Sequence, residues 1–185
     1  NPVRRPVRLP FFLFCAFIML FSHGTYSGFF SIHLENLGYS GVFIGAAWAL
    51  ASVAEIVVML TSERIFKRFS YQNILILTFV VAGGRWILMG LATSAPLILF
   101  AQLLHALTYG AFHVASILYM DELSPEDAKT TGQAINNAVT YGMGIMAGFL
   151  FTGYFFDIIG VPWLFFISSL LAFFGGLVFC ADHRR

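Results

Sequence analysis

Long apolar runs make up most of the chain, and short polar turns separate one run from the next. Each of six runs is close to or longer than the ~20 residues that a helix needs to cross a bilayer. A strand with open edges would leave backbone groups unpaired in lipid, so every span is expected to be a helix. The pattern therefore predicts an all-α, polytopic membrane protein whose six transmembrane helices cover residues 10–35, 41–62, 71–92, 96–120, 129–155 and 161–180.

Composition supports this prediction and narrows the possible partners. Hydrophobic residues form 59% of the chain and charged residues 10%, a balance that suits lipid and not a soluble domain of 185 residues. The net charge is only +1, and the basic residues are too scattered for nucleic acid. Cys15 and Cys180 lie in apolar stretches and are interpreted as buried hydrophobic residues. The lipid bilayer is an expected partner, whereas nucleic acid, a metal and a cofactor are not expected.

Basic residues are distributed unevenly between the two sides of the predicted bundle. The turns near Glu35, Thr93 and Asp157 carry no Lys or Arg. The other side holds nine of the ten basic residues: Arg4, Arg5, Arg8, Arg64, Lys67, Arg68, Lys129, Arg184 and Arg185. Because Lys and Arg accumulate in the cytoplasmic loops of membrane proteins, both termini are predicted to be cytoplasmic.

The tenth basic residue, Arg85, falls inside the hydrocarbon region, where a charge costs several kcal/mol unless it is paired. From the helical rise per residue, Arg85 lies ~10 Å below the outer boundary of a core ~30 Å thick, and His105 ~14 Å below it. His23 and Glu55 come out at ~18 Å and ~20 Å. Four ionisable side chains on four helices are therefore expected at mid-depth, which makes them candidate functional residues.

Further polar and aromatic side chains recur on these helices at intervals of three, four or seven residues, so they share helix faces with the ionisable ones. Polar faces are costly toward lipid, and we expect them to converge on a shared, partly hydrated cavity. The predicted substrate- and proton-binding residues are Glu55, Arg85, His105, His23, Tyr26, Trp48, Asn137 and Tyr141.

We hypothesise that Glu55 or His105 takes up a proton in one state of the protein and releases it in another. Arg85 does not titrate usefully, so it is expected to be a fixed counter-charge, or a clamp on an anionic substrate group, that faces the acid and the imidazole across a wet cleft. A lone His or Asn in the membrane often makes only an interhelical hydrogen bond of about 1 kcal/mol or less. That is our interpretation of His113 and Asn136.

The same residues carry a family resemblance. His23-Gly24, Leu37-Gly38-Tyr39-Ser40, Ala54-Glu55-Ile56, Arg85-Trp86 and Leu104-His105 resemble the C-terminal half of a Major Facilitator Superfamily transporter. The similarity is to the lactose-permease-like branch and, within it, to the 3-phenylpropionic acid transporter group. It extends over nearly the whole chain. The combined pattern is fairly specific, although no single piece of it is.

The resemblance implies one half of a twelve-helix fold, built from two inverted three-helix repeats, with substrate bound near the midplane against an N-terminal six-helix half that is missing here. Residues 1–9 are then the cytoplasmic end of a central loop, 10–181 the six-helix bundle and 182–185 a cytoplasmic tail. The implied protein is a multi-pass transporter of the bacterial inner (plasma) membrane, a proton symporter for a small organic solute such as an aromatic carboxylate. A sugar or nucleoside proton symporter and a non-transporting assembly protein are the alternatives.

Two departures from the family pattern affect the site. Where lactose permease has a carboxylate one turn after the histidine, this chain has Thr108, so the resemblance shifts the proton role to Glu55, His105 or His23. In addition, the superfamily's loop pattern is degraded between the second and third spans. A similar pattern occurs at Gly153, Asp157 and Gly160, where the resemblance implies a gating contact between helices.

Two other classes of six-span protein are disfavoured. An aquaporin-type channel needs two Asn-Pro-Ala motifs, and the sequence has none. An intramembrane serine protease would use the Gly-x-Ser-Gly pattern at Ser40 with His105 or His113 as its base. Ser40 stands at a turn, however, where capping of the following helix explains it. The chain is therefore not expected to be an enzyme.

Overall fold

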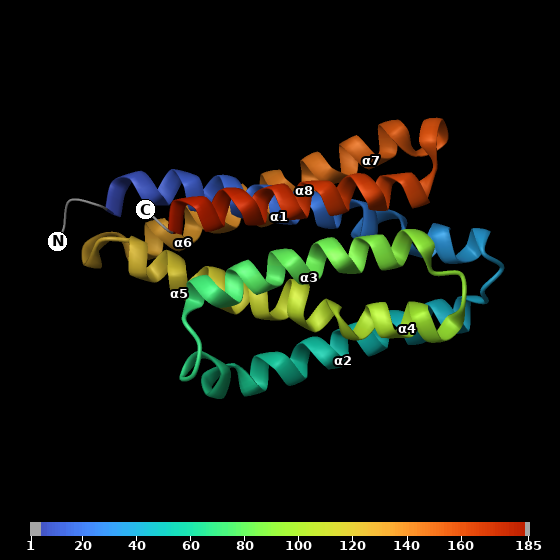
Figure 1. Ribbon diagram of the computed structural model, residues 1–185, viewed down its shortest axis with the longest axis horizontal. Coiled ribbons are helices and arrows are strands. Elements are labelled where there is room, and N and C mark those ends of the chain that lie inside the picture. The colour runs from blue at the N-terminus through green and yellow to red at the C-terminus, as the bar shows by residue number, and fades with distance from the viewer. Residues whose placement is uncertain (1–4, 184–185) are drawn as a thin grey trace.

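The computed structural model describes the backbone of residues 5–183 and the side chains of residues 9–181, and within this part every regular element is a helix (Figure 1). The elements are α1 Arg5–Asn36, α2 Gly41–Phe66, α3 Tyr71–Leu91, α4 Ala95–Leu103, η2 Ala106–Ala111, α5 Phe112–Leu123, η3 Glu126–Ala128, α6 Lys129–Asn137, η4 Ala138–Gly144, α7 Ile145–Ile159 and α8 Val161–His183. The segments η2 and η4 are π-helical, and η3 is a 3₁₀ turn.

Six helices of the described chain are long and apolar enough to cross a membrane, which confirms the predicted number of spans. Two of the six are composite, because the π-helical segment η2 joins α4 to α5 and η4 joins α6 to α7. Successive spans alternate in direction, so the fourth span runs antiparallel to the first (Figure 1). Two inverted three-helix repeats require this alternation.

The predicted ends of the second and fifth spans were each four residues too early. The second helix continues through Glu63 and Arg64 to Phe66 instead of stopping at residue 62. Glu and Arg are good helix formers, so the change from apolar to charged residues indicates the edge of the bilayer and not the end of the helix. The fifth span continues to Ile159 instead of ending at residue 155. Gly160 then ends the helix with a positive φ of 78°.

Serine residues begin two of the helices. The Ser40 side chain accepts a hydrogen bond from the Phe43 amide at 3.4 Å at the start of α2. Ser70 accepts one from the Asn73 amide at 3.3 Å at the start of α3. The capping interpretation of Ser40 is confirmed.

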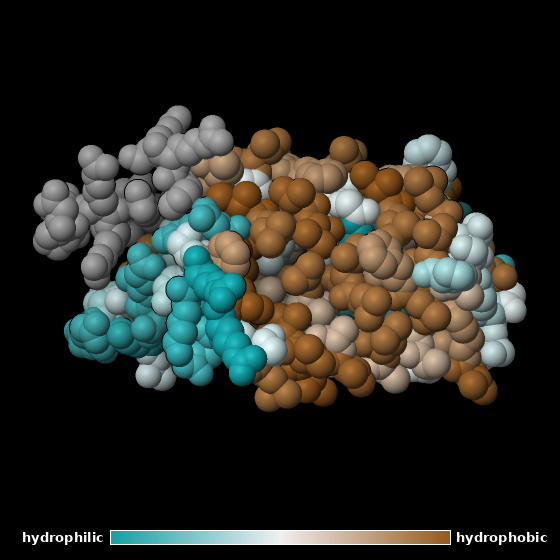
Figure 2. Space-filling view, turned by 60° about the horizontal axis from the view of Figure 1, so that its bottom comes forward, coloured by the Kyte–Doolittle hydropathy of each residue, from teal (hydrophilic) through white to brown (hydrophobic). Residues whose placement is uncertain are grey.

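The two ends of the molecule differ in charge. The beginning and end of the described chain and the α2–α3 turn lie at one end, which we call the termini end (Figure 1). The turns α1–α2, α3–α4 and α7–α8 lie at the other, the opposite end. Arg64, Lys67, Arg68 and Lys129 are at the termini end, and no described Lys or Arg is at the opposite end. Figure 2 shows a broad hydrophobic belt between more hydrophilic ends. The predicted cytoplasmic residues Arg4, Arg184 and Arg185, and the side chains of Arg5 and Arg8, lie outside the described residues.

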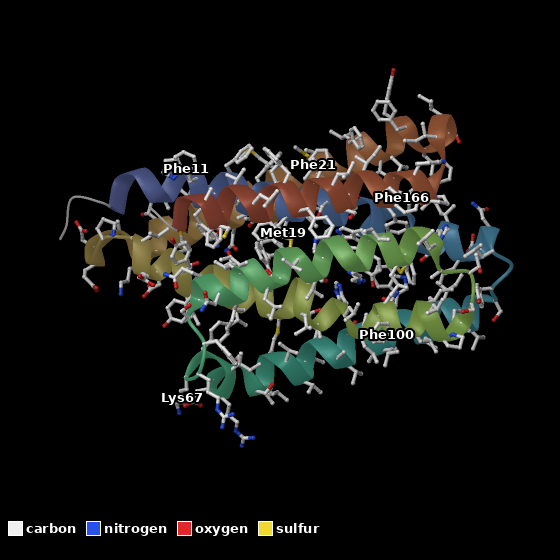
Figure 3. The ribbon with its side chains drawn as sticks, viewed as in Figure 1. Phe11, Met19, Phe21, Lys67, Phe100 and Phe166 are labelled. Atoms are coloured by element: carbon white, nitrogen blue, oxygen red, sulfur yellow. The ribbon has the colours of Figure 1, made fainter. Side chains whose placement is uncertain are left out.

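Helix α1 is the central element of the bundle, packing against α8, α7 and η4, while α3 packs along α8. Met19 on α1 is completely buried, whereas Phe11 and Phe100 point outward from the bundle (Figure 3). Where α1 crosses α7, a Cβ built on Gly148 would lie only 3.0 Å from the Gly24 Cα and closer still to the Phe21 carbonyl oxygen. Gly148 therefore lets two backbones touch, as small residues commonly do where membrane helices cross.

This contact generates a stability prediction. Gly148→Ala should lower the free energy of unfolding by about 1–3 kcal/mol, because its methyl group meets backbone atoms that cannot rotate away. Gly84→Ala on α3 is the matched control, since a Cβ there meets nothing within 4 Å. Thermal unfolding in detergent measures both. Equal transition temperatures for the two variants would contradict the proposed packing.

Candidate functional site

A hollow of about 350 Å³ opens at mid-depth between the second, fourth and fifth spans. We call it the central hollow, and its lining residues are Glu55, Met59, Tyr109, His113, Asn137 and Tyr141. Three of the predicted site residues, Glu55, Asn137 and Tyr141, are among them. The other predicted members, among them Arg85 and His105, are not lining residues of this hollow.

An acid and an imidazole meet at the wall of the central hollow. The Glu55 Oε2 atom lies 3.6 Å from the His105 Nε2 atom, which joins the second span to the fourth. The Glu55 side chain is 21% exposed and the His105 side chain only 9%. A Cβ on Gly110 would come within 3.0 Å of the Glu55 Cγ, so the missing side chain of Gly110 makes room for the acid. Glu55 therefore reaches solvent and His105 lies behind it.

Arg85 is completely buried and does not line the central hollow. Its Nε donates to the Ala101 carbonyl at 2.8 Å, and its Nη1 donates to the Thr108 hydroxyl at 3.3 Å. The guanidinium carbon lies 4.2 Å from the ring centroid of Tyr26 and 4.6 Å from that of Trp86. Cation–π contacts of this kind are most favourable when water is excluded.

The predicted pairing of Arg85 with Glu55 across a wet cleft is therefore wrong. The ion pairs of the described chain include Glu55 with His105 but none between Glu55 and Arg85. The Arg85 side chain is nevertheless buried inside the bundle, as expected. A backbone carbonyl, a hydroxyl and two aromatic faces replace the expected carboxylate.

Aromatic and imidazole rings separate the buried arginine from the hollow. The Tyr26 ring lies 5.2 Å from that of His105, and its hydroxyl donates to Gln102 Oε1 at 2.6 Å. The centroid of the Trp48 ring lies 4.9 Å from that of Tyr26, and the Trp48 Nε1 atom donates to the Ser31 hydroxyl at 3.1 Å. These contacts link the first, second and fourth spans.

His23 belongs to the same buried layer. Its Nδ1 lies 2.9 Å from the Met19 carbonyl oxygen. Its ring packs edge-on to the Trp86 ring, with the two centroids 4.8 Å apart, and its centroid lies 6.4 Å from that of His105. Four buried atoms of this layer have no hydrogen-bond partner in the described chain: His23 Nε2, Arg85 Nη2, Gln102 Nε2 and His105 Nδ1. Buried polar atoms are nearly always satisfied in folded proteins, so unused hydrogen-bonding capacity concentrates behind the central hollow.

The two π-helical segments flank the central hollow. Tyr109 belongs to η2 and Tyr141 to η4, while Asn137 directly precedes η4. π-Helical turns are rare and often occur at functional sites. Here they set the positions of the side chains that the fourth and fifth spans contribute.

The predicted site residues did not include Met59, Tyr109 and His113, which line the central hollow, or Gln102, which belongs to the buried layer behind it. His113 was interpreted as a residue that only makes an interhelical hydrogen bond. Its Nδ1 atom does lie 2.6 Å from the Tyr141 hydroxyl, but the residue also lines the central hollow. Its spacing of four residues from Tyr109 was the available signal. Met59 and Gln102 lie in apolar runs and gave none. Asn136 does make the predicted interhelical hydrogen bond, donating to Ser116 at 3.0 Å.

Gly153, Asp157 and Gly160 lie away from this site, in α7 and at the α7–α8 turn of the opposite end (Figure 1). Asp157 and Gly160 border a different hollow there. The gating role implied by the resemblance stays a prediction.

Six bundled spans with a polar hollow at mid-depth form an architecture typical of membrane transporters. Residues 3–167 match the model of the MFS_1 like family. The chain belongs to this family of Major Facilitator Superfamily transporters, which confirms the resemblance and the expectation that it is not an enzyme.

Individual relatives agree with this assignment. The chain is 30% identical over 165 residues to the probable 3-phenylpropionic acid transporter of Escherichia coli (strain K12), covering 88% of this chain and 43% of the relative. It is 26% identical over 185 residues to the maltose permease of Geobacillus stearothermophilus, covering 98% and 45%. The crystal structure of the nucleoside transporter NupG has the same fold, with a TM-score of 0.81 at 14% identity over 95% of this chain and 48% of NupG. The chain spans about half the length of the curated relatives it matches.

The buried hydrogen bond of Tyr26 generates a second prediction. Tyr26→Phe should destabilise the protein by about 1–3 kcal/mol, because the Gln102 side-chain oxygen then stays buried without a donor. Tyr154→Phe is the control, since that side chain is 73% exposed. Thermal unfolding in detergent compares the two variants, and a Tyr26→Phe protein as stable as the control would refute the importance of this bond.

Proposed function

We propose that this chain forms the C-terminal half of a proton-coupled secondary transporter for a small organic solute. The Glu55–His105 contact supports the proposal most directly, because it joins two titratable groups, one open to the central hollow and one behind it. A proton entering from the hollow reaches Glu55 first. Separation of the two helices would break the contact and change the proton affinity of both groups.

The proposed orientation places the termini end in the cytoplasm and the opposite end outside. The described Lys and Arg residues outside the bundle interior are all at the termini end, as expected from the positive-inside rule. The curated relatives named above come from bacteria, so we infer a bacterial inner (plasma) membrane.

A second, N-terminal six-helix half is part of the proposal. The most apolar windows of the second and fifth spans are only 17% buried, against 61% for the first span. These two spans also carry four of the six residues that line the central hollow. A second half packed against them would enclose the hollow near the membrane midplane, where transporters of this type bind substrate.

The lining of the central hollow supports a neutral, hydroxyl-bearing ring compound, such as a sugar or nucleoside. Asn137, Tyr109 and Tyr141 offer hydrogen bonds and ring faces, and Glu55 accepts hydrogen bonds from hydroxyl groups but repels an anion. The relatives include a maltose permease.

An aromatic carboxylate is the second candidate. It is favoured by the unsatisfied Nη2 of Arg85 and by the 30% identical relative named a 3-phenylpropionic acid transporter. Binding to Arg85 would require the Tyr26 and His105 rings to move aside.

The proton hypothesis is tested with Glu55→Gln in the complete transporter that unites this chain with an N-terminal half. Proton-driven accumulation of substrate should fall at least about tenfold, while substrate exchange at equal concentrations continues, because only the titratable group is lost. The measurements are uptake and substrate-induced pH change in vesicles. Glu35→Gln, exposed at the opposite end, is the control. Unchanged accumulation in Glu55→Gln would exclude Glu55 as a proton carrier.

The two substrate classes are distinguished by ligand-induced shifts of the unfolding temperature, each variant being compared with its own ligand-free state. For a sugar or nucleoside, Asn137→Ala should abolish the shift and Arg85→Gln should preserve it. For an aromatic carboxylate, Arg85→Gln should abolish the shift. A carboxylate that stabilises Arg85→Gln as well as the original protein would rule out Arg85 as its clamp.

A further inference from the structure

The guanidinium of Arg85 brings a positive charge into the middle of the bundle, and none of the carboxylates of the described chain pairs with it. The residue is completely buried. Its two hydrogen bonds go to neutral acceptors, the Ala101 carbonyl and the Thr108 hydroxyl. Buried charges in proteins are usually paired, because the loss of hydration is costly. The positive charge of Arg85 is therefore available to a counter-ion from outside the chain.

Two N–H donors at this charge are unused. Arg85 Nη2 and Gln102 Nε2 are buried without a hydrogen-bond partner in the described chain. Gln102 is also completely buried, and its side-chain oxygen accepts a hydrogen bond from the Tyr26 hydroxyl at 2.6 Å. That bond occupies the oxygen of the amide and leaves its NH₂ group free. Guanidinium and amide nitrogens donate and do not accept, so the two together suit an anion.

His105 contributes a third nitrogen, and the protonation of its ring decides whether this nitrogen repels or attracts an anion. Its Nε2 faces the Glu55 Oε2 atom at 3.6 Å, which leaves Nδ1 as the lone-pair side of a neutral ring. Nδ1 is buried and has no partner in the part of the chain that the structure describes. Protonation of the ring turns Nδ1 into a donor, so anion binding should accompany proton uptake.

The three groups surround the ring of Tyr26. The Arg85 guanidinium carbon lies 4.2 Å from its centroid, the centroid of the His105 ring lies 5.2 Å from it, and Gln102 binds its hydroxyl. The guanidinium also donates to one acceptor a turn before His105 and to another a turn after it along the fourth span. The three groups therefore belong to one small, buried region behind the central hollow.

We propose that this buried region binds a small inorganic anion, such as chloride, held by Arg85, Gln102 and the protonated ring of His105. Hydrogen bonds from charged donors to an anion are the strong ones. A monatomic ion needs much less space than a carboxylate with its attached ring, which would require the Tyr26 and His105 rings to move. The ion neutralises Arg85, and it is separate from the transported solute of the proposed function.

Proton uptake at His105 depends on the titratable and charged groups that face it from three other spans and from its own. They are Glu55 on α2, His23 and Tyr26 on α1, Arg85 on α3 and Tyr109 on η2. A protonated His105 and Arg85 repel each other, and a bound anion offsets this repulsion. Glu55 repels the anion while it is ionised. Proton and anion should therefore enter and leave the layer together.

The test uses the complete transporter in detergent without substrate, with sodium chloride or with sodium gluconate, whose anion is far larger than chloride. We expect the unfolding temperature at about pH 5.5 to be at least about 2 °C higher in chloride. The difference should shrink at about pH 8, because a neutral His105 and an ionised Glu55 disfavour the anion. No difference between the salts at about pH 5.5 overturns the proposal.

Gln102→Glu tests the assignment to these donors. It keeps an acceptor for the Tyr26 hydroxyl and replaces the free NH₂ group by a carboxylate oxygen beside Arg85. The variant should lose the chloride effect, and in gluconate it should be about as stable as the original protein is in chloride. Arg64→Gln, at an exposed arginine of the termini end, is the control and should retain the effect. An unchanged chloride effect in Gln102→Glu contradicts the assignment.

Bromide locates the ion in the original protein, independently of any variant. Crystals grown with bromide at the lower pH should show an anomalous peak within hydrogen-bond distance of Arg85 Nη2, and a map without a peak there overturns the proposal. If the donors serve a substrate instead, 3-phenylpropionate added in gluconate raises the unfolding temperature whereas chloride does not. Because the salts are compared without a proton gradient, this test can fail while accumulation still depends on Glu55, and the reverse.

Discussion

The burial of the Arg85 guanidinium without a carboxylate is the constraint that shapes the centre of this bundle. A charge in a medium of low dielectric needs partners on all sides. Two of its N–H groups donate to the Ala101 carbonyl and the Thr108 hydroxyl, and two aromatic rings lie against the guanidinium. Ala101 lies in the last turn of α4, just before the fourth span becomes π-helical at Ala106. The arginine therefore takes its backbone acceptor beside the interruption of the fourth span.

The same interruption also builds the central hollow. After His105 the chain continues as the π-helical segment η2, which places Gly110 against Glu55 and Tyr109 on the wall of the hollow. The fifth span repeats the arrangement, with Tyr141 in η4. Irregular helical turns are tolerated at membrane depth only where protein or a water-filled cavity surrounds them. Here both π-helical segments contribute lining residues to the central hollow, so the irregular backbone, the buried charge and the hollow depend on one another.

Sequence reasoning predicted the six spans correctly, because hydropathy over about 20 residues adds along a helix. The fixed rise per residue also placed four ionisable side chains at similar levels of their helices. It failed on the pairing of Arg85 with Glu55, because pairing depends on how the helices rotate toward one another. The acceptor that replaces the acid is the backbone carbonyl of Ala101. Every residue has a backbone carbonyl, so the amino-acid sequence does not show which one accepts the bond. Gln102 escaped for a related reason, since a single amide inside an apolar run gives no periodic signal.

Thr108 connects the buried charge to the proposed proton site. A carboxylate at this position would neutralise Arg85, whereas the hydroxyl accepts a hydrogen bond and leaves the positive charge in place. The acid of the site, Glu55, is instead separated from the guanidinium by the rings of His105 and Tyr26. Charges interact more strongly at low dielectric than in water, so a proton bound at Glu55 or His105 would change the field at Arg85 even without direct contact. The fixed charge and the titratable pair would then remain coupled while the rings keep them apart, and a movement of Tyr26 or His105 would change that coupling.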